Sequence, residues 1–316
     1  MPSPAASRPL FRTSAWDALP AALAVVQLAL ALGFYIAWPG FSWAARLGWL
    51  ALYAFSVGWN LNSIAHNFIH NPFFASERLN RLMSLVITLA LLSPQTMYRY
   101  VHLRHHAGNA DRPDAKGETI DPLSIYRHGH EGRPEPMLPY VFLEFFRGEA
   151  PFELARRIGE KRPRDARAAR FEFWAVIAVY GALLVAGIFT GRWAFVPAMV
   201  VASYLGQCVS NLNGYYEHLG GNPDKPIAWG VSTYGRLYNW VFLYNGYHAE
   251  HHYRPKVHWT QMTALHRQIA DEQRREGVTV IRPAHFLGFL EPRNRHIPTA
   301  RRPKAQRPSA SAPVSP

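Results

Sequence analysis

Four long apolar segments, arranged as two pairs, constrain the fold of this chain more than any other feature. A membrane-spanning helix needs about 20 mostly apolar residues. Four stretches meet this requirement: 16–38, 43–65, 171–190 and 193–213. Only a short turn separates the two members of each pair, one at Pro39 and the other at Gly191. The sequence therefore predicts an all-α integral membrane bundle of four transmembrane helices, built from two helical hairpins.

Three short histidine clusters adjoin these segments. They are His66 and His70; His102, His105 and His106; and His248, His251 and His252. With 15 histidines among 316 residues, an HxxHH triplet is expected by chance about 0.03 times per chain, yet it occurs twice. Histidines three and four positions apart lie on one helix face, and imidazole binds iron, copper, nickel and zinc. Together with His218, which follows the fourth apolar segment, the clusters offer nine nitrogens, a number that suits two metal ions with positions left for oxygen.

Residues that could orient these histidines lie close to them in the sequence. A ligating histidine usually donates its second ring N–H to a carboxylate or carbonyl oxygen. The main candidates are Asn67, Asp111, Asn213, Glu217 and Glu250, with Asn71, Asn109, Asp114 and Asp121 also nearby. The remaining histidines show no such pattern, and we interpret them as surface groups or as groups that contact a metal-binding residue. They are His128, His130, His258, His266, His285 and His296.

Two further apolar stretches are too short or too polar to be assigned as membrane spans. If residues 82–98 crossed the membrane, the first and second histidine clusters would lie on opposite sides, which a shared metal site forbids. We therefore predict helices at 82–98 and 227–247 that are buried in the protein or lie at the membrane interface. The sequence is consistent with a single domain over 1–291, followed by a basic, Pro- and Arg-rich disordered tail over 292–316.

The positive charges indicate how this domain is oriented. The net charge is +13, with 12 Lys or Arg in residues 107–170 and 7 in residues 282–316, whereas the hairpin tips contain only Arg192. Because cytoplasmic loops carry the excess of Lys and Arg, both termini and all the histidine clusters are predicted to be cytoplasmic, in a helical cap. This distribution and the long apolar runs argue against a nucleic-acid-binding protein.

Other kinds of metal site are less compatible with the chain. Its single cysteine, Cys208, excludes a disulfide framework, a thiolate zinc site and an iron–sulfur cluster carried by this chain. A histidine-rich membrane protein that binds or transports metal remains a non-enzymatic alternative. Transporters, however, place their ligands near the bilayer midplane, and here the histidines lie at the ends of the apolar segments and beyond them.

Three boxes of the forms HxxxH, HxxHH and HxxHH beside paired apolar helices resemble the membrane fatty acid desaturase family. The segment NGYHAEHHYRP at 245–255 is similar to that family's last box with its following proline. The second box at 102–106 is followed by Asp111 and Asp121, which also fits the family. The resemblance extends from about residue 66 to residue 259.

This resemblance implies a chemistry. In that family the boxes bind two irons on the cytoplasmic side, and a histidine outside the boxes completes the ligand set, a place that His218 takes here. The implied enzyme uses O2 as co-substrate to remove hydrogen from an unactivated C–H bond, most simply as a desaturase of fatty acid or lipid acyl chains. A hydroxylase or hydrocarbon monooxygenase of the same superfamily is the alternative.

The resemblance also implies partners. The substrate is expected to be a lipid or acyl chain in an apolar cleft, with aromatic lining from Trp59, Tyr98, Tyr100, Tyr215 and Tyr216. Because the chain carries no recognisable electron carrier of its own, a separate ferredoxin-, rubredoxin- or cytochrome b5-like protein is expected to deliver electrons. The basic loop at 107–170 could dock an acidic carrier.

Overall fold

The computed structural model describes residues 9–300, and within that range the chain is helical and forms no strand. The predicted all-α class is therefore confirmed. The α-helices are α1 Ala18–Ala37, α2 Trp43–Asn60, α3 His66–His70, α4 Glu77–Leu91, α5 Gln95–Gly108, α6 Met137–Arg147, α7 Pro151–Lys161, α8 Pro163–Thr190, α9 Phe195–His218, α10 Arg236–Val241, α11 His248–Tyr253 and α12 Met262–Glu276. The 3-10 helices are η1 Ala15–Asp17, η2 Trp38–Gly40, η4 Pro226–Ala228, η5 Trp259–Gln261, η6 His285–Leu290 and η7 Pro292–His296, and η3 Leu61–Ala65 is a π-helix.

Three helical segments are long and apolar enough to cross a membrane: Ala15–Gly40, Pro163–Thr190 and Phe195–His218. The predicted fourth span, α2, is 18 residues long, and Arg46, Asn60 and its tryptophan and tyrosine side chains lower its hydropathy. Many large apolar side chains on the long helices are exposed, among them Leu30, Ile36, Ile188, Phe189 and Val201. An apolar surface of this extent is typical of contact with lipid. The chain is thus an integral membrane protein with three clearly apolar spans.

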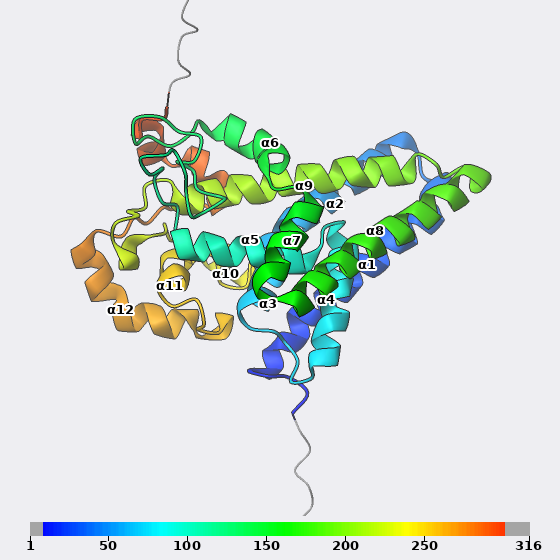
Figure 1. Cartoon of the computed structure of the whole chain (residues 1–316), viewed down its shortest axis with the longest axis horizontal. Coiled ribbons are helices and arrows are strands. Elements are labelled where there is room, and N and C mark those ends of the chain that lie inside the picture. The colour runs from blue at the N-terminus through cyan, green and yellow to red at the C-terminus, as the bar shows by residue number, and fades with distance from the viewer. Residues whose placement is uncertain (1–8, 301–316) are drawn as a thin grey trace, which may run out of the picture.

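The long helices form two hairpins whose tips meet at one end of the molecule, the right-hand edge of Figure 1. There, Arg192 at the α8–α9 turn donates hydrogen bonds to the carbonyl oxygens of Tyr35 and Ile36 near the end of α1, at 3.1 and 3.3 Å. The hydroxyl of Tyr35 in turn donates to the carbonyl oxygen of Leu183 at 3.0 Å. These contacts fix the two hairpins side by side, with both tips on the same side.

Helices α2 and α9 cross in close contact at two glycines. A Cβ atom at Gly206 would lie 2.5 Å from the carbonyl oxygen of Ala54, and one at Gly58 would lie 2.8 Å from the carbonyl oxygen of Gly206. Small residues at such a crossing allow two membrane helices to bring their backbones together. This contact links the first hairpin to the helix that carries His218.

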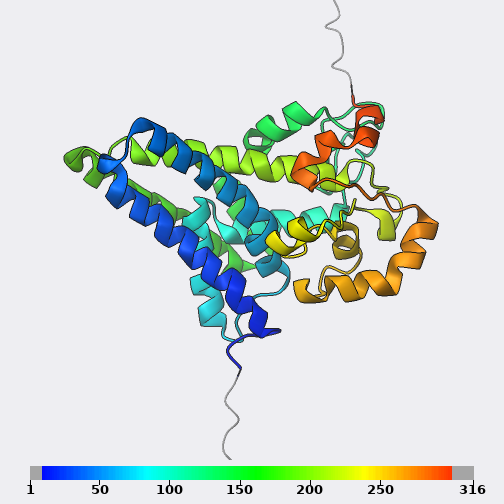
Figure 2. The same ribbon diagram turned by 180° about the vertical axis from the view of Figure 1, so that it is seen from behind.

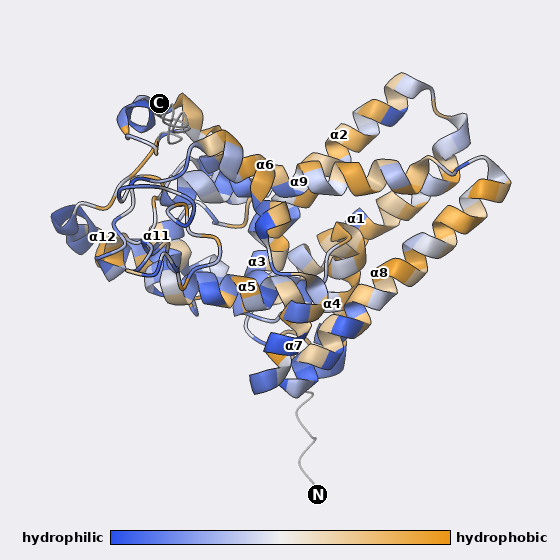
Figure 3. Cartoon of the chain, turned by 45° about the horizontal axis from the view of Figure 1, so that its top comes forward, coloured by the Kyte–Doolittle hydropathy of each residue, from blue (hydrophilic) through white to orange (hydrophobic). Residues whose placement is uncertain are grey.

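The opposite end of the molecule is polar and contains the histidine clusters. Figure 3 shows hydrophilic residues gathered around α11 and α12, whereas the far ends of α1, α2, α8 and α9 are hydrophobic. Seen from behind in Figure 2, α10, α11 and α12 pack beside the ends of the long helices. The fold therefore separates an apolar bundle from a polar cap.

The helix predicted at 82–98 is instead two helices, α4 and α5. The break lies at Leu92, whose φ of 56° is left-handed, and at Pro94, which precedes α5. Proline disfavours a helical conformation in the residue before it, so the apolar run could not continue as one helix. Glu172 of α8 holds the new helix start, because its carboxylate accepts from Thr96 N at 2.8 Å and from Ser84 Oγ at 2.6 Å.

The single helix predicted at 227–247 is also wrong. The segment contains η4, an extended stretch and the short helix α10, followed by a turn in which Leu243 and Tyr244 have positive φ. The backbone passes close to itself here, because the amide of Thr233 donates to the carbonyl oxygen of Gly246 at 2.8 Å and a Cβ atom at Gly246 would lie 2.5 Å from the carbonyl oxygen of Thr233. The chain is thereby directed into α11, which carries the third histidine cluster.

The predicted tail begins later than residue 292. Residues 292–296 form η7, and the amide of Ala300 donates to the carbonyl oxygen of Pro134 at 2.8 Å. Asn294 is buried and donates to the carbonyl oxygen of Gly288 at 2.9 Å. The first part of the predicted tail is therefore packed on the domain, and the rest, 301–316, lies outside the described residues.

Candidate metal centre

The nine histidines singled out from the sequence converge at the polar end of the bundle and form two groups. Within each group the candidate ligand nitrogens all lie within 4.8 Å of one another. The first group is His66, His70, His102, His106 and His251, and the second is His105, His218, His248 and His252. Each group could hold a metal ion, so the site could hold two.

Helix geometry explains how each HxxHH triplet contributes to both groups. In α5, His102 and His106 are four residues apart and belong to the first group, whereas His105 belongs to the second. In α11 the assignment is reversed, because His248 and His252 belong to the second group and His251 to the first. Residues i and i+4 are about 40° apart around the helix, whereas residue i+3 is about 60° from residue i and about 100° from residue i+4. Two such helices facing each other therefore surround two centres.

Two other helices bring in the remaining histidines. His66 and His70 lie on α3, which continues α2 through the π-helix η3. A π turn changes the angular position of every residue after it and often occurs at functional sites, and here it directly precedes His66. His218 is the last residue of α9 and is buried, so the end of a long bundle helix delivers it to the second group.

The separations between ring nitrogens fit ligands of a common metal ion. In the first group, Nε2 of His251 lies 2.7 Å from that of His66 and 3.1 Å from that of His106. In the second group, Nε2 of His218 lies 3.1 Å from Nε2 of both His105 and His248. Two nitrogens bound at right angles to one metal, each about 2.1 Å away, would lie about 3.0 Å apart. One ring nitrogen has a single in-plane lone pair or proton and cannot satisfy two such neighbours, so the arrangement suits a shared ion.

The second nitrogen of three rings in the second group is held by an oxygen of the protein. Nδ1 of His105 donates to Asp121 Oδ2 at 2.8 Å, and Nδ1 of His252 donates to Asn109 Oδ1 at 2.6 Å. Nδ1 of His218 donates to a backbone carbonyl oxygen at 3.3 Å. With the proton on Nδ1, Nε2 is left with a free lone pair, and Nε2 of His252 has no hydrogen-bond partner in the described part of the chain. These nitrogens are available to bind metal.

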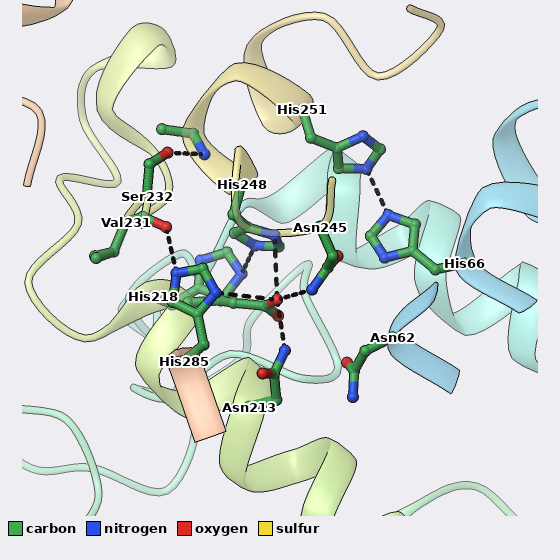
Figure 4. Close-up of polar contacts among 12 residues, drawn as sticks. Asn62, His66, Asn213, His218, Val231, Ser232, Asn245, His248, His251 and His285 are labelled. Atoms are coloured by element: carbon green, nitrogen blue, oxygen red, sulfur yellow. Dashed lines mark hydrogen bonds and ion pairs between the residues drawn. The ribbon is translucent and has the colours of Figure 1, made fainter. Parts of the chain in front are cut away.

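A buried carboxylate, Glu217, supports the fourth ring. Its Oε1 accepts hydrogen bonds from Nδ2 of Asn213 and of Asn245, each at 2.6 Å. The same oxygen lies 3.6 Å from Nδ1 of His248 and 3.7 Å from Nδ1 of His285. Figure 4 shows these asparagines and histidines directed toward one another, with His66 facing His251 beside them.

Burial keeps most of the site neutral. Desolvation, reinforced by the nearby His105 and Arg99, lowers the pKa of His70 to about 3. Desolvation and neighbouring histidines lower the pKa values of six more histidines of the site well below the ordinary value: His66, His102, His106, His248, His251 and His252. Burial also opposes the charged form of His105, but Asp121 outweighs it and raises the pKa of His105. Neutral imidazole is the form that binds metal, so the site is prepared for it near pH 7.

The residues predicted to orient the histidines differ in how directly they contact the histidine rings. Asp111 accepts from the amides of residues 120 and 121 and so positions Asp121, and Asn213 positions Glu217. The carboxylate of Glu250 accepts from Ser232, Tyr234 and His266. Asn67 donates to the carbonyl oxygen of Ser63 at 2.8 Å, and no hydrogen bond in the described chain joins it to a histidine of the site.

Sequence reasoning missed several residues of this network. His285 is fully buried and donates from Nε2 to the carbonyl oxygen of Val231 at 2.9 Å. Tyr238 donates to Asn213 Oδ1 at 3.0 Å, and His266 was not assigned to a particular partner. Asn245, which donates to Glu217, was also missed. It is the one residue of this set that the sequence could have indicated, because it lies three residues before His248, next to the third histidine cluster.

A cavity of about 510 Å³ reaches the histidines from one side. His66, His102, His105, His218 and His248 lie in its wall, so it borders both groups. Of the five aromatic residues expected to line a cleft, only Tyr98 lines this cavity. Tyr215 donates to the carbonyl oxygen of Glu135 at 2.7 Å, and Trp59 to that of Val241 at 2.9 Å. Tyr100 packs in the cluster around Met97, and Tyr216 contacts Gly288.

The bundle and its paired histidine groups define a helical membrane protein with a candidate metal centre, and comparison with known families agrees. Residues 41–284 of the chain match the fatty acid desaturase family, so the chain belongs to that family. Comparison with curated proteins gives no match. Membership indicates an oxidoreductase that acts on lipid acyl chains in a membrane.

Proposed function

We propose that this protein is an oxygen-dependent di-iron desaturase of a fatty acid or lipid acyl chain. The observation that carries the proposal is the division of the three histidine clusters and His218 into two groups of five and four nitrogens in a chain of the desaturase family. When bound, a pair of irons would supply the activation of O2 and the oxidation of an unactivated C–H bond.

The residues of the chain have distinct roles in this proposal. The first group would hold one iron and the second group the other, with the nine histidines as ligands. Asp121 and Asn109 fix the ring orientation of His105 and His252 through hydrogen bonds to Nδ1, and Glu217 lies beside His248. The cavity along α9 would place the substrate chain next to both groups and keep it away from bulk water.

The reaction requires electrons from outside the chain. Desaturation removes two hydrogen atoms from the substrate, and two electrons and two protons from a donor complete the reduction of O2 to two waters. With Cys208 as its single cysteine, the chain carries no iron–sulfur centre. A separate ferredoxin-, rubredoxin- or cytochrome b5-like protein is proposed as the donor.

Lipid analysis of expressing cells tests the reaction. Products lighter by two hydrogen atoms support a desaturase, and products heavier by one oxygen atom would instead identify a hydroxylase or hydrocarbon monooxygenase. Replacement of either His105 or His251 by Ala should abolish the product and lower the iron content, because each removes a ligand from a different group. The control His296→Ala changes an exposed histidine outside both groups. No change of lipids and no bound iron in the wild-type protein would refute the proposal and favour a different role for the histidines.

The orientation is a second part of the proposal. The 12 Lys and Arg residues of 107–170 support a cytoplasmic position for the histidine site and both termini. In a Cys208→Ser background, Thr190→Cys at the hairpin tip and Lys161→Cys on α7 can be treated with a membrane-impermeable maleimide. Thr190→Cys should react in intact cells, and Lys161→Cys only after the cells are opened. The reverse pattern would overturn the orientation without affecting the assigned reaction.

A further inference from the structure

One face of α9 is polar where a membrane helix would be expected to be apolar. Ser210 and Asn211 follow Gln207 by three and four residues, Gly214 follows them by four and three residues, and all four line the cavity that reaches the histidines. Such spacing places them on one helix face. Polar residues within a membrane helix are costly and mark substrate pathways. The stripe extends from Gln207 to His218, 11 residues away, or about 16 Å along the helix.

A buried carboxylate faces the same cavity. Glu144 of α6 is 6% exposed and lines the cavity. In the described residues it makes no hydrogen bond and no ion pair, although arginines are near. Arg147 is bound to both carboxylate oxygens of Glu135 at 2.7 and 2.9 Å, and Arg127 donates to the carbonyl oxygen of Pro122 at 2.9 Å. Glu144 is thus a buried acid with free acceptor atoms.

Contacts between helices fix Glu144 over the polar face of α9. Nδ2 of Asn211 donates to the carbonyl oxygen of Val141 at 3.2 Å, and the hydroxyl of Tyr204 donates to that of Phe142 at 2.8 Å. These bonds hold α6 along the α9 segment that contains Gln207. Asn211 and Tyr204 precede His218 by 7 and 14 residues, so this part of α6 lies about two to four helical turns from the histidine end of α9.

The arginines nearest Glu149 in the cavity wall already have a carboxylate partner. Arg104 and Arg157 both bind Glu149, at 2.8 and 3.2 Å. Leaving a buried carboxyl group without a partner costs free energy, and groups of this kind concentrate at functional sites. A ligand that donates a hydrogen bond would relieve this cost for Glu144.

We propose that Glu144, together with Gln207 on the polar face of α9, binds a hydrogen-bond-donating group on the lipid substrate, such as a hydroxyl or an amine. This inference rests on the proposed function and deepens it. The substrate is then a lipid with a polar group held at a set distance from the reacting carbon, and not a plain hydrocarbon. Anchoring that group selects which carbon lies beside the two histidine groups.

The electrostatics of the pocket agree with a donor ligand. Burial raises the pKa of Glu144 to about 7, Arg127 and Arg147 oppose the rise, and Glu135 and Asp121 add to it. Near pH 7 the protonated acid and the carboxylate are therefore both populated, and a donated hydrogen bond would stabilise the carboxylate. A lipid carboxylate would meet the unfavourable interaction of like charges at this position.

The experiment measures binding and does not depend on turnover. Purified protein in detergent is titrated with 1-hexadecanol, hexadecylamine, hexadecyl methyl ether and sodium palmitate, and tryptophan fluorescence reports binding. The methyl ether keeps the oxygen acceptor of the alcohol and replaces the donor hydrogen by a methyl group. The wild type should bind the alcohol or the amine about 10-fold more tightly than the ether, a factor consistent with one hydrogen bond to a charged group.

Variants locate the preference. Glu144→Leu removes the acceptor, so the preference for the alcohol over the ether should fall to less than about 2-fold, because the hydrogen bond to a charged group is lost. Glu144→Gln keeps the shape of the side chain and takes the place of the leucine variant if that variant does not fold. Glu118→Gln, at an exposed carboxylate of the same cavity wall, should leave the preference intact. Equal binding of the ether by the wild type, tighter binding of palmitate, or an unchanged preference in both Glu144 variants would overturn the inference. Lipid oxidation by a wild type that shows no donor preference would leave the proposed function standing, whereas donor preference without oxidation of any lipid would refute that function alone.

Discussion

The carboxylate of Asp17, at the start of α1, accepts a hydrogen bond from Nε2 of His258 at 2.9 Å, across 241 residues of sequence. The indole of Trp259 donates to the same oxygen at 3.0 Å. Asp17 is fully buried, and His258 follows the third histidine cluster. The contact therefore ties the first membrane helix to the segment that positions α11.

Replacing Asp17 by Ala should destabilise the protein. The variant leaves the ring N–H of His258 and that of Trp259 buried without an acceptor, and each unsatisfied group costs about 1–3 kcal/mol. Thermal unfolding in detergent should show a clear decrease in Tm. Glu77→Ala is the control, because Glu77 pairs with Arg12 at the surface, where an ion pair contributes about 0–1 kcal/mol. Equal effects of the two variants would contradict this account.

Asp121→Asn should weaken metal binding without unfolding the protein. The carboxylate fixes the ring of His105, and loss of such a partner typically costs about 10–100-fold in metal affinity or activity. Metal content after dialysis against a graded series of chelator concentrations measures the change. Asp114→Asn is a matched control, since Asp114 accepts from the amides of Lys116 and Glu118 in the same loop. An unchanged affinity in Asp121→Asn would remove His105 from the proposed ligands.

Gly206→Ala should lower stability, although Ala is normally the better helix former. The added Cβ would lie 2.5 Å from the carbonyl oxygen of Ala54 and from Cβ of Val57, so α2 and α9 must move apart. Overpacking of this kind costs about 1–3 kcal/mol. Gly181→Ala on α8 provides the comparison, because nothing lies within 4 Å of its added Cβ, and it should be neutral or stabilising. A Gly206→Ala protein as stable as the wild type would disprove the close crossing.

The metal-free protein should lose stability as the pH falls below about 6.5. Unfolded histidines take up protons near that pH, whereas burial lowers the pKa of His70 to about 3 in the folded protein. The unfolded state then binds more protons, and the free energy of unfolding decreases as the pH decreases. The raised pKa of His105 has the opposite effect on the free energy of unfolding. More histidines of the site have lowered pKa values, so the net effect is a loss of stability. Tm values at several pH values between about 7.5 and 5 measure the slope.

The matched variant for this prediction is His70→Gln. It removes one histidine that titrates differently in the two states, so Tm should fall less steeply with pH than in the wild type. Identical slopes would show that His70 is protonated equally in both states. A rise in Tm on acidification of the wild type would contradict the predicted neutral histidine groups.

Local patterns were sufficient to predict the long helices and the histidine clusters. An apolar run of the length of α8 or α9 favours a helix wherever it lies, and i, i+4 spacing fixes which histidines share a face. The same reasoning failed at Leu92 and at 227–247, where an apolar run is interrupted. There, a proline and tight backbone contacts such as that of Gly246 with Thr233 determine the path, and hydropathy does not record them.

The sequence by itself determined that the chain is an all-helical membrane protein with three clusters of metal-binding residues, because periodicity and hydropathy are properties of neighbouring residues. The tertiary structure alone decided how nine histidines divide into groups of five and four. It also decided that His285 and His258 are buried hydrogen-bond partners and that Glu144 faces the cavity. These relationships join residues far apart in the chain, and only the packing of whole helices, which depends on every contact at once, brings them together.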